Sequence, residues 1–169
     1  MGLNPERAEN TRKNAAALTA MLDRQNLMYT VEEESDARIS IRIHFQGEDL
    51  PLTLHIVLRT DRQIATVFSV MPERFPESRL TEAALAVAVA NQGLIDGSFD
   101  LNMKTGEVRF RLTSSYIETV LSEMLFSYLM YVSAETVDRY NDRFTALSRG
   151  EADLAEFLRL EQQDAGTAG

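Results

Sequence analysis

Residues 80–148 read LTEAALAVAVANQGLIDGSFDLNMKTGEVRFRLTSSYIETVLSEMLFSYLMYVSAETVDRYNDRFTALS and combine three patterns in succession. Residues 80–93 are rich in alanine and predict a helix. Residues 98–112 alternate between apolar and polar side chains and predict a β-hairpin. From residue 115 toward residue 150 the chain predicts one long helix that is apolar over much of its circumference. Such a helix needs packing partners on more than one side, which suggests a protein that works by binding proteins, itself included.

The ends of these elements carry suitable residue types. Thr81 is the predicted N-cap of the first helix, and Gly93 is its predicted stop. The hairpin is expected to turn at Lys104-Thr105-Gly106. Its predicted cross-strand pairs are Phe99 with Phe110 and Leu101 with Val108, which leaves Asp100, Asn102, Arg109 and Arg111 on the outer side.

The first half of the chain predicts a helix followed by four strands. Asn4 and Pro5 are the cap and the first residue of a helix that ends by Asn26. The predicted strands span residues 27–34, 38–45, 50–59 and 63–71. Pro72 and Pro76 disfavour regular structure, so residues 72–76 are expected to form a loop.

The register of the second and third strands follows from their alternation. A loop centred on Gly47-Glu48 places all their aliphatic side chains on one face, and a slip by one residue would move them to the other face. The predicted pairs are Ile43 with Leu52, Ile41 with Leu54, His44 with Pro51 and His55 with Ser40.

The elements follow the order α-β-β-β-β-α-β-β-α, which predicts an α+β fold with an antiparallel sheet packed by helices. Residues 151–162 add a short amphipathic helix through Leu154, Phe157 and Leu158. The length of 169 residues fits one domain, which we expect over residues 1–163, with a disordered tail over residues 164–169.

Composition narrows the function further. The chain has no cysteine, which excludes disulfides, thiolate metal sites and thiol nucleophiles. Residues 1–13 are polar and predict no signal peptide, and no segment is apolar over the length of a membrane span, so we expect a cytoplasmic protein. The net charge of −9 disfavours nucleic acid and anionic membranes as partners unless a basic patch is segregated.

One local pattern points to a known family. Residues 85–112 contain Ala90-Asn91, the strand Phe99-Asp100-Leu101, and the turn and strand of residues 104–111, with the long helix behind. This pattern resembles the YbjN family, which is labelled a bacterial sensory transduction regulator and is similar in fold to the dimeric chaperones of type III secretion. The resemblance implies a type III secretion chaperone-like fold and names no mechanism. This chain departs from a compact secretion chaperone by an extra C-terminal segment after Gly150.

No catalytic or metal-binding pattern emerges, so we expect no enzyme, no metal and no cofactor. In the predicted register His44 and His55 lie four residues apart, about 13 Å, which is too far to share a metal. The acidic run of residues 32–36 lacks the glycine and ligand spacing of a calcium loop and is interpreted as a solvated turn. The glycines near Asp96 match no phosphate loop, and no Gly-x-Ser-x-Gly motif is present.

The outer sheet face and the long helix are the candidate binding surfaces. Cationic side chains gather on the predicted sheet face, and the predicted partner-binding residues are Arg38, Arg42, His55, Arg59, Arg109 and Arg111, with His44 nearby. Arginine suits an acidic or extended partner because its guanidinium forms paired hydrogen bonds with carboxylates. The alternative is a solvated face balanced by Asp49, Asp61, Asp100 and Glu107.

The long helix carries two apolar stripes. Its wide face is predicted to comprise Ile117, Val120, Leu121, Met124, Leu125, Tyr128, Leu129 and Val132. A second stripe comprises Phe126 and Met130, with Tyr131 beside them. This second stripe either completes the core under the first helix or forms a two-fold dimer interface.

The leading hypothesis is a non-catalytic, chaperone-like or regulatory homodimer that docks a protein client by helix-in-groove binding or strand addition. A second hypothesis is a regulator that senses a small ligand between the helix of residues 80–93 and the sheet, where the alanines could leave room. A third, nucleic-acid binding through the arginine face, predicts a steep dependence on salt.

Overall fold

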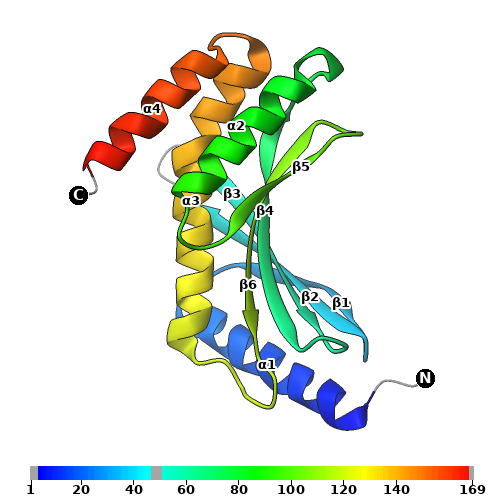
Figure 1. The fold of residues 1–169 in the computed structure, drawn as a ribbon. Helices are drawn as coiled ribbons and strands as arrows, with labels where there is room; N and C mark the ends of the chain where they lie inside the picture. Colours follow the sequence, from blue (N-terminus) through cyan, green and yellow to red (C-terminus); the bar gives the residue numbers. More distant parts are fainter. Residues whose placement is uncertain (1–3, 47–50, 168–169) are drawn as a thin grey trace. The chain divides into compact units, whose positions relative to one another are not determined.

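The computed structural model describes residues 4–46 and 51–167. Its helices are α1 (Pro5–Arg24), α2 (Leu80–Gly93), α3 (Glu123–Arg149) and α4 (Leu154–Thr167), with the 3-10 turn η1 (Glu77–Arg79) before α2. Its strands are β1 (Tyr29–Glu34), β2 (Arg38–Gln46), β3 (Pro51–Arg59), β4 (Ile64–Arg74), β5 (Ser98–Asn102) and β6 (Glu107–Ser115). The strand order is β1-β2-β3-β4-β6-β5 (Figure 1), so the predicted α+β fold with an antiparallel sheet is confirmed.

The chain divides into two compact units. Unit 1 comprises residues 1–69 and 112–135, and unit 2 comprises residues 70–111 and 136–169. Strands β4 and β6 and helix α3 each contribute residues to both units. The expectation of one domain over residues 1–163 stays a prediction.

Helix α1 and strands β1 to β3 form the base of unit 1. The Asn4 side chain accepts a hydrogen bond from the N–H of Glu6, and Pro5 opens the helix, as the sequence predicts. One face of α1 is buried through Leu18, Met21 and Leu22, and the helix packs against β2 and β3. Figure 1 shows α1 in blue alongside these strands. The aliphatic side chains of β2 and β3 share the buried face: Ile39, Ile41, Ile43, Leu52, Leu54, Ile56 and Leu58.

The predicted pairing of β2 with β3 has the correct face and the wrong register. Ile43 lies opposite Leu54, and His55 lies opposite Arg42, a shift of two residues from the prediction. The observed pairing extends to Gln46 opposite Pro51. Because the side-chain period is two, the shift leaves the buried set unchanged. It also places the two histidines two positions apart, about 7 Å at the usual rise per residue.

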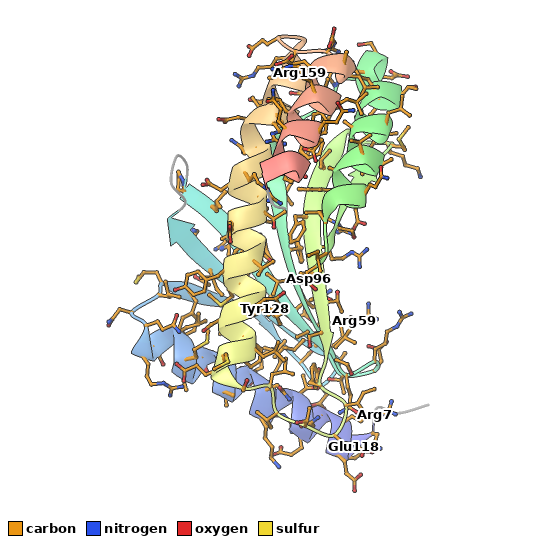
Figure 2. All side chains as sticks on the ribbon, turned by 60° about the vertical axis from the view of Figure 1, so that its left-hand side comes forward. Arg7, Arg59, Asp96, Glu118, Tyr128 and Arg159 are labelled. Atoms are coloured by element: carbon orange, nitrogen blue, oxygen red, sulfur yellow. The ribbon has the colours of Figure 1, made fainter. Side chains whose placement is uncertain are left out.

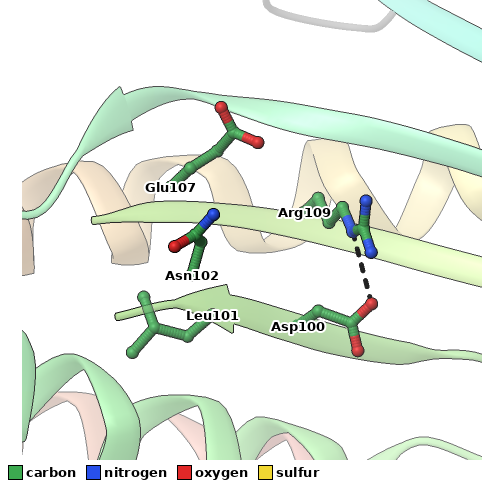
Figure 3. A pocket seen from close by; sticks show the side chains of 5 residues that line it. All are labelled: Asp100, Leu101, Asn102, Glu107 and Arg109. Atoms are coloured by element: carbon green, nitrogen blue, oxygen red, sulfur yellow. Dashed lines mark hydrogen bonds and ion pairs between the residues drawn. The ribbon is translucent and has the colours of Figure 1, made fainter. Parts of the chain in front are cut away.

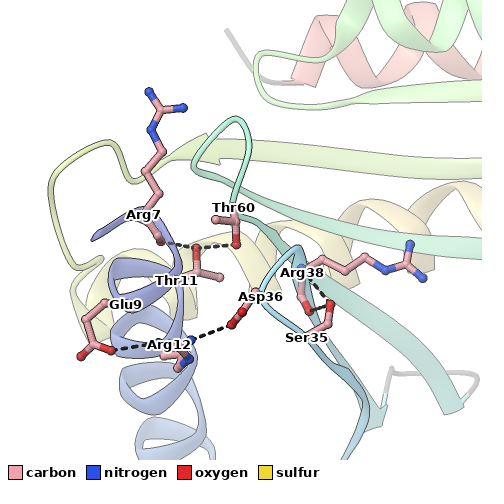
Figure 4. A network of polar contacts seen from close by, with 8 residues as sticks. All are labelled: Arg7, Glu9, Thr11, Arg12, Ser35, Asp36, Arg38 and Thr60. Carbon is pink, nitrogen blue, oxygen red and sulfur yellow. Dashed lines mark hydrogen bonds and ion pairs between the residues drawn. The ribbon is translucent and has the colours of Figure 1, made fainter. Parts of the chain in front are cut away.

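A polar network in unit 1 explains why the long helix does not begin at Ser115. The Tyr116 hydroxyl lies 3.0 Å from the Thr11 hydroxyl and donates to the carbonyl of Arg59 at 2.9 Å. Thr60 donates to the same Thr11 oxygen, as Figure 4 shows. These buried bonds hold the chain after β6 against α1 in a non-helical path.

The same path continues to Ser122. The Asn14 side chain donates to the carbonyl of Thr119 and accepts from the N–H of Leu121. Glu118 has a φ of 53°, which an α-helix does not allow. Ser122 then caps α3 by accepting the N–H of Leu125. Local propensity alone favours a helix here, and these long-range bonds override it.

Unit 2 contains the hairpin, α2 and the C-terminal part of α3. The hairpin pairs Phe99 with Phe110 and Leu101 with Val108, as predicted. The turn is held by the Asn102 carboxamide, which accepts the N–H groups of Lys104 and Thr105. The rings of Phe75, Phe99, Phe110, Tyr140, Phe144 and Phe157 form one aromatic cluster.

Three predicted boundaries are wrong. Arg79, not Thr81, occupies the N-cap position of α2, because η1 continues directly into the helix. The loop predicted from Pro72 is also wrong at its start, because strand β4 continues through Pro72 to Arg74. Proline is compatible with extended backbone and lacks only the N–H donor, and Pro72 lies beyond Ile64–Phe68, the residues that pair with β3. Helix α4 runs to Thr167, past the predicted start of a disordered tail at residue 164.

Candidate protein-binding site

Four of the predicted partner-binding residues lie together on β2 and β3. Arg42 lies opposite His55, and Arg38 lies opposite Arg59. Each already has a carboxylate partner. Arg42 and His55 Nδ1 both lie 3.3 Å from the Glu32 carboxylate, Arg38 pairs with Glu33, and Arg59 pairs with Asp61 at 3.0 Å.

The two glutamates lie on β1, within the predicted strand of residues 27–34, and belong to the acidic run of residues 32–36 that was interpreted as a solvated turn. The register of β1 against β2 shifts between Val31 and Glu33. A bulge of this kind breaks the strict alternation of a strand, so consecutive Glu32 and Glu33 both reach the cationic face. The hydrogen bond from Arg38 holds the pKa of Glu33 below its usual value, and Arg59 does the same for the pKa of Asp61.

The remaining two arginines lie in unit 2 and share one acid. Asp100 accepts from Arg111 at 2.8 Å and from Arg109 at 3.3 Å, and Figure 3 shows Asp100 and Arg109 pointing toward each other across the two strands. The hydrogen bond from Arg111, ahead of the contact with Arg109, lowers the pKa of Asp100. A shallow pocket of about 250 Å³ beside them is lined by Asp100, Leu101, Asn102, Glu107 and Arg109.

The predicted arginine face is therefore divided between the two units and is neutralised by carboxylates. The alternative prediction was a solvated face whose arginines are balanced by four acids. Two of these acids, Asp61 and Asp100, do pair with the predicted arginines. Glu107 pairs with Arg74 instead, and Asp49 lies outside the described residues. Binding of a partner through these arginines stays a prediction, and a partner would have to compete with the existing ion pairs.

The structure divides the apolar residues of the long helix differently from the two predicted stripes. Phe126 and Met130, predicted either to complete the core or to form a dimer interface, are 0% exposed within the single chain, so they belong to the core and a second copy cannot reach them in this fold. Met124 and Tyr128 of the predicted wide face are exposed, whereas Leu121 and Leu129 of the same face are buried; Tyr131 is also exposed, at 49%. Tyr128 lies on the N-terminal half of α3 (Figure 2). The cap at Ser122 sets the start of the helix, and both stripes are apolar, so the pattern alone could not choose between them.

The alanine-rich helix α2 buries three of its alanines. Ala83, Ala86 and Ala90 have no exposed surface. The Asn91 side chain makes two hydrogen bonds to the backbone of Phe99, which holds α2 close to β5. The alanines thus permit close approach of α2 to the sheet, and a small-ligand site between α2 and the sheet stays a prediction.

A groove that the sequence analysis did not single out lies beside α1 in unit 1. It has a volume of about 460 Å³ and is lined by Arg12, Ala15, Ala16, Thr19, Tyr29, Val31, Glu34, Ile39 and Ile41. Tyr29 and Val31 lie opposite Ile43 and Ile41, so they point to the buried face of the sheet. Helix α1 packs on β2 and β3, and Val31 on the outer strand β1 remains 45% exposed. The groove thus has an apolar floor and one open side.

The groove runs along the edge of the sheet. Strand β1 is the first strand in the sheet order, and an edge strand leaves one row of backbone N–H and C=O groups available for pairing. Arg12 lines one end of the groove and bonds to Asp36 at 2.6 Å and Glu9 at 3.1 Å (Figure 4). The alternation of Tyr29 and Val31 and the small Ala15-Ala16 pair are the sequence signals that could have located this site.

Metal and membrane sites were also considered. Among residues 4–46 and 51–167 no group of three or more histidine or acidic side chains is arranged to hold a metal ion. Within the same residues, no helix is long and apolar enough to cross a membrane.

The family follows from comparison with known proteins. Residues 14–146 match the YbjN family model, described as "Putative bacterial sensory transduction regulator". Since this match covers more than half of the chain, the chain belongs to the YbjN family. A search of curated proteins found no match. The resemblance predicted from residues 85–112 is confirmed.

Two solved structures are similar in fold. One is YbjN from E. coli, titled "a putative transcription regulator", with 12% identity, a TM-score of 0.56, and coverage of 78% of this chain and 91% of that chain. The other is a chain of the HopA1-SchA chaperone-effector complex, with 11% identity, a TM-score of 0.53, and coverage of 78% and 95%. At these identities the likeness shows the fold alone, and it confirms the predicted chaperone-like fold.

Proposed function

We propose that this protein is a non-catalytic, chaperone-like regulatory module that binds an extended segment of a client protein along β1, in the groove beside α1. The observation that carries this proposal is the open groove of about 460 Å³ on an edge strand of the sheet. The family description as a regulator and the fold shared with a chain of a chaperone-effector complex support it.

Strand addition explains how one groove can bind a segment without a deep pocket. An extended segment pairs its backbone with the free edge of β1, and this pairing supplies affinity without regard to sequence. Every second side chain of the segment then faces the groove. Val31 in the groove is 45% exposed and favours apolar side chains, and the small Ala15 and Ala16 leave space for them.

The rim of the groove adds charge selection. Glu34 lines the groove and is exposed, whereas Arg12 is already held by Asp36 and Glu9. The client segment that fits has apolar residues at alternate positions and a basic residue near Glu34. An acidic segment would be repelled, which agrees with the net charge of −9.

The test is co-purification of the tagged protein from its own host, with binding of the recovered client measured directly. Val31→Lys places a charge in the groove, and Thr30→Lys places the same charge on the neighbouring residue, which points to the other face of β1. We expect Val31→Lys to abolish client binding and Thr30→Lys to retain it. Equal binding by both variants would contradict the proposal.

We also propose that the protein forms a homodimer, through the exposed stripe of Met124, Tyr128 and Tyr131 on α3. Exposed apolar stripes commonly form interfaces, and i, i+4, i+7 spacing places these three side chains on one side of the helix. Met124→Glu with Tyr131→Glu should give folded monomers by light scattering, because both residues are exposed. A dimer that survives both substitutions would exclude this stripe as the interface.

A further inference from the structure

Helix α4 lies outside the part of the chain that the family model matches. The match ends at residue 146, and α4 begins at Leu154. Within unit 2, α4 nevertheless packs against α2, and Figure 1 shows it in red beside α2 and α3. The surface beneath α4 is therefore one that the family-matched residues alone would leave uncovered.

One aromatic side chain anchors α4. Phe157 is 2% exposed, and among residues 154–163 it is the one residue that is fully buried. Its ring centroid lies 5.3 Å from that of Phe144 on α3. A single buried aromatic residue among half-exposed neighbours is typical of a short helix bound in a groove, where few residues carry most of the binding energy.

A largely buried ion pair orients the helix. Glu161 follows Phe157 by four residues and so lies on the same side of α4. Its carboxylate accepts a hydrogen bond from the Tyr140 hydroxyl at 2.8 Å and pairs with Arg143 at 2.5 Å. Burial, together with the Glu161 carboxylate, raises the pKa of Tyr140, which keeps its hydroxyl protonated as a donor.

The start of α4 is also held by α2. The backbone N–H of Leu154 donates to the Glu82 carboxylate at 3.1 Å. At the other end of α2, Gly93 lies beside Glu161: a Cβ at this position would be in van der Waals contact, 3.7 Å from the carboxylate oxygen. Packing against α3 is incomplete: a groove of about 220 Å³ remains, lined by Asp142, Arg143, Ala146, Ala152, Glu156, Phe157 and Leu160.

We propose that α2 and residues 136–149 of α3 form a helix-binding groove, and that α4 occupies it as a built-in ligand. The partner that fits this groove is an amphipathic helix with a phenylalanine and, four residues later, a glutamate. The phenylalanine takes the place of Phe157 against Phe144, and the glutamate takes the place of Glu161 between Tyr140 and Arg143. Such a helix binds by displacing α4.

The test uses the full-length chain and a fluorescent peptide of residues 151–167, with binding followed by anisotropy. The wild-type chain should not bind the peptide at micromolar concentration, because a short tether gives α4 an effective concentration on the order of millimolar. The chain carrying Phe157→Ser loses its own anchor and should bind the peptide saturably. A peptide carrying the same substitution should bind that chain about 30-fold more weakly.

The matched control is Arg159→Ser, which changes an exposed residue of α4 that pairs with Glu156 on the same helix (Arg159 is labelled in Figure 2). This chain should behave as wild type. Hydrogen exchange of α2 and β5 in the Phe157→Ser chain reports whether unit 2 stays folded. Unfolding of these elements, or a folded Phe157→Ser chain that takes up no peptide, would overturn the proposal and make α4 an ordinary part of the core.

Discussion

The two units differ in whether the surface beside a packed helix is open or covered. In unit 1, α1 packs on β2 and β3, and the inward face of β1 beside it stays partly open, with Val31 45% exposed. In unit 2, the flank of α2 is covered by α4, which buries Phe157. The open groove has a free strand edge and suits an extended segment. The covered groove already holds the helix α4, so it suits a helix. This chain thus has two grooves of different chemistry.

The difference also concerns how firmly each groove is built. The wall of the open groove is α1, which is fixed by buried hydrogen bonds from Thr11 and Asn14 to residues beyond β6. The covered groove is lined by an aromatic cluster whose centre is Phe144. Substitutions that loosen one groove and spare the other test whether the two are built separately.

The largest effect should come from Phe144→Ala. The Phe144 ring is 2% exposed and contacts four other aromatic rings, so its loss leaves a cavity in unit 2. We expect a loss of about 3–5 kcal/mol in the free energy of unfolding. Urea denaturation followed by circular dichroism measures it. A loss below about 1 kcal/mol would mean that the cluster is not the core of unit 2.

A smaller effect is expected for Asn14→Ala. This change leaves the N–H of Leu121 and the carbonyl of Thr119 without their side-chain partner. Unsatisfied buried polar groups of this kind cost about 1–3 kcal/mol. Hydrogen exchange should show faster opening in residues 116–122 and in α1, with β5 and α2 unchanged. Faster hydrogen exchange confined to unit 2 would contradict the proposal that the two units are stabilised separately.

The smallest effect is expected for the pH dependence of the Asp100 ion pairs. Because Arg111 and Arg109 lower the pKa of Asp100 in the folded state, its stabilising contribution is present above the unfolded pKa and is lost as pH falls through the folded pKa. Solvent screening limits this contribution to about 0–1 kcal/mol. The stability difference between wild type and Asp100→Asn should therefore shrink as pH is lowered from neutral into the acid range. A difference that grows on acidification would reverse the assigned sign.

Much of the fold could be predicted because local patterns determined it. The Asn4-Pro5 start, the Ser98–Asn102 hairpin strand and the buried face of β2 and β3 each depend on short-range chemistry. The start of α3 could not be predicted, because hydrogen bonds to Asn14, about a hundred residues away in the sequence, hold residues 119–121 out of a helix. Which apolar side chains of α3 face the core depends on where the helix begins, so this could not be predicted either.

The candidate sites were harder to predict than the fold. Sequence placed the arginines correctly on one face of each strand, but it could not show that a bulge in β1 turns Glu32 and Glu33 toward them. The groove beside α1 depends on which strands α1 covers, and that information is tertiary. Its lining residues, such as Ala16 and Val31, are ordinary in the sequence and gain significance only from their position.

The central claim is that the open groove binds a client segment by strand addition along β1. The most direct measurement is hydrogen exchange of the protein with and without a peptide of the client segment. The account predicts new protection of the β1 amides, Tyr29–Glu34, in wild type and in Thr30→Lys, and none in Val31→Lys. A client that binds while leaving the β1 amides unprotected, or that protects only α2 or the β5–β6 hairpin, would contradict it.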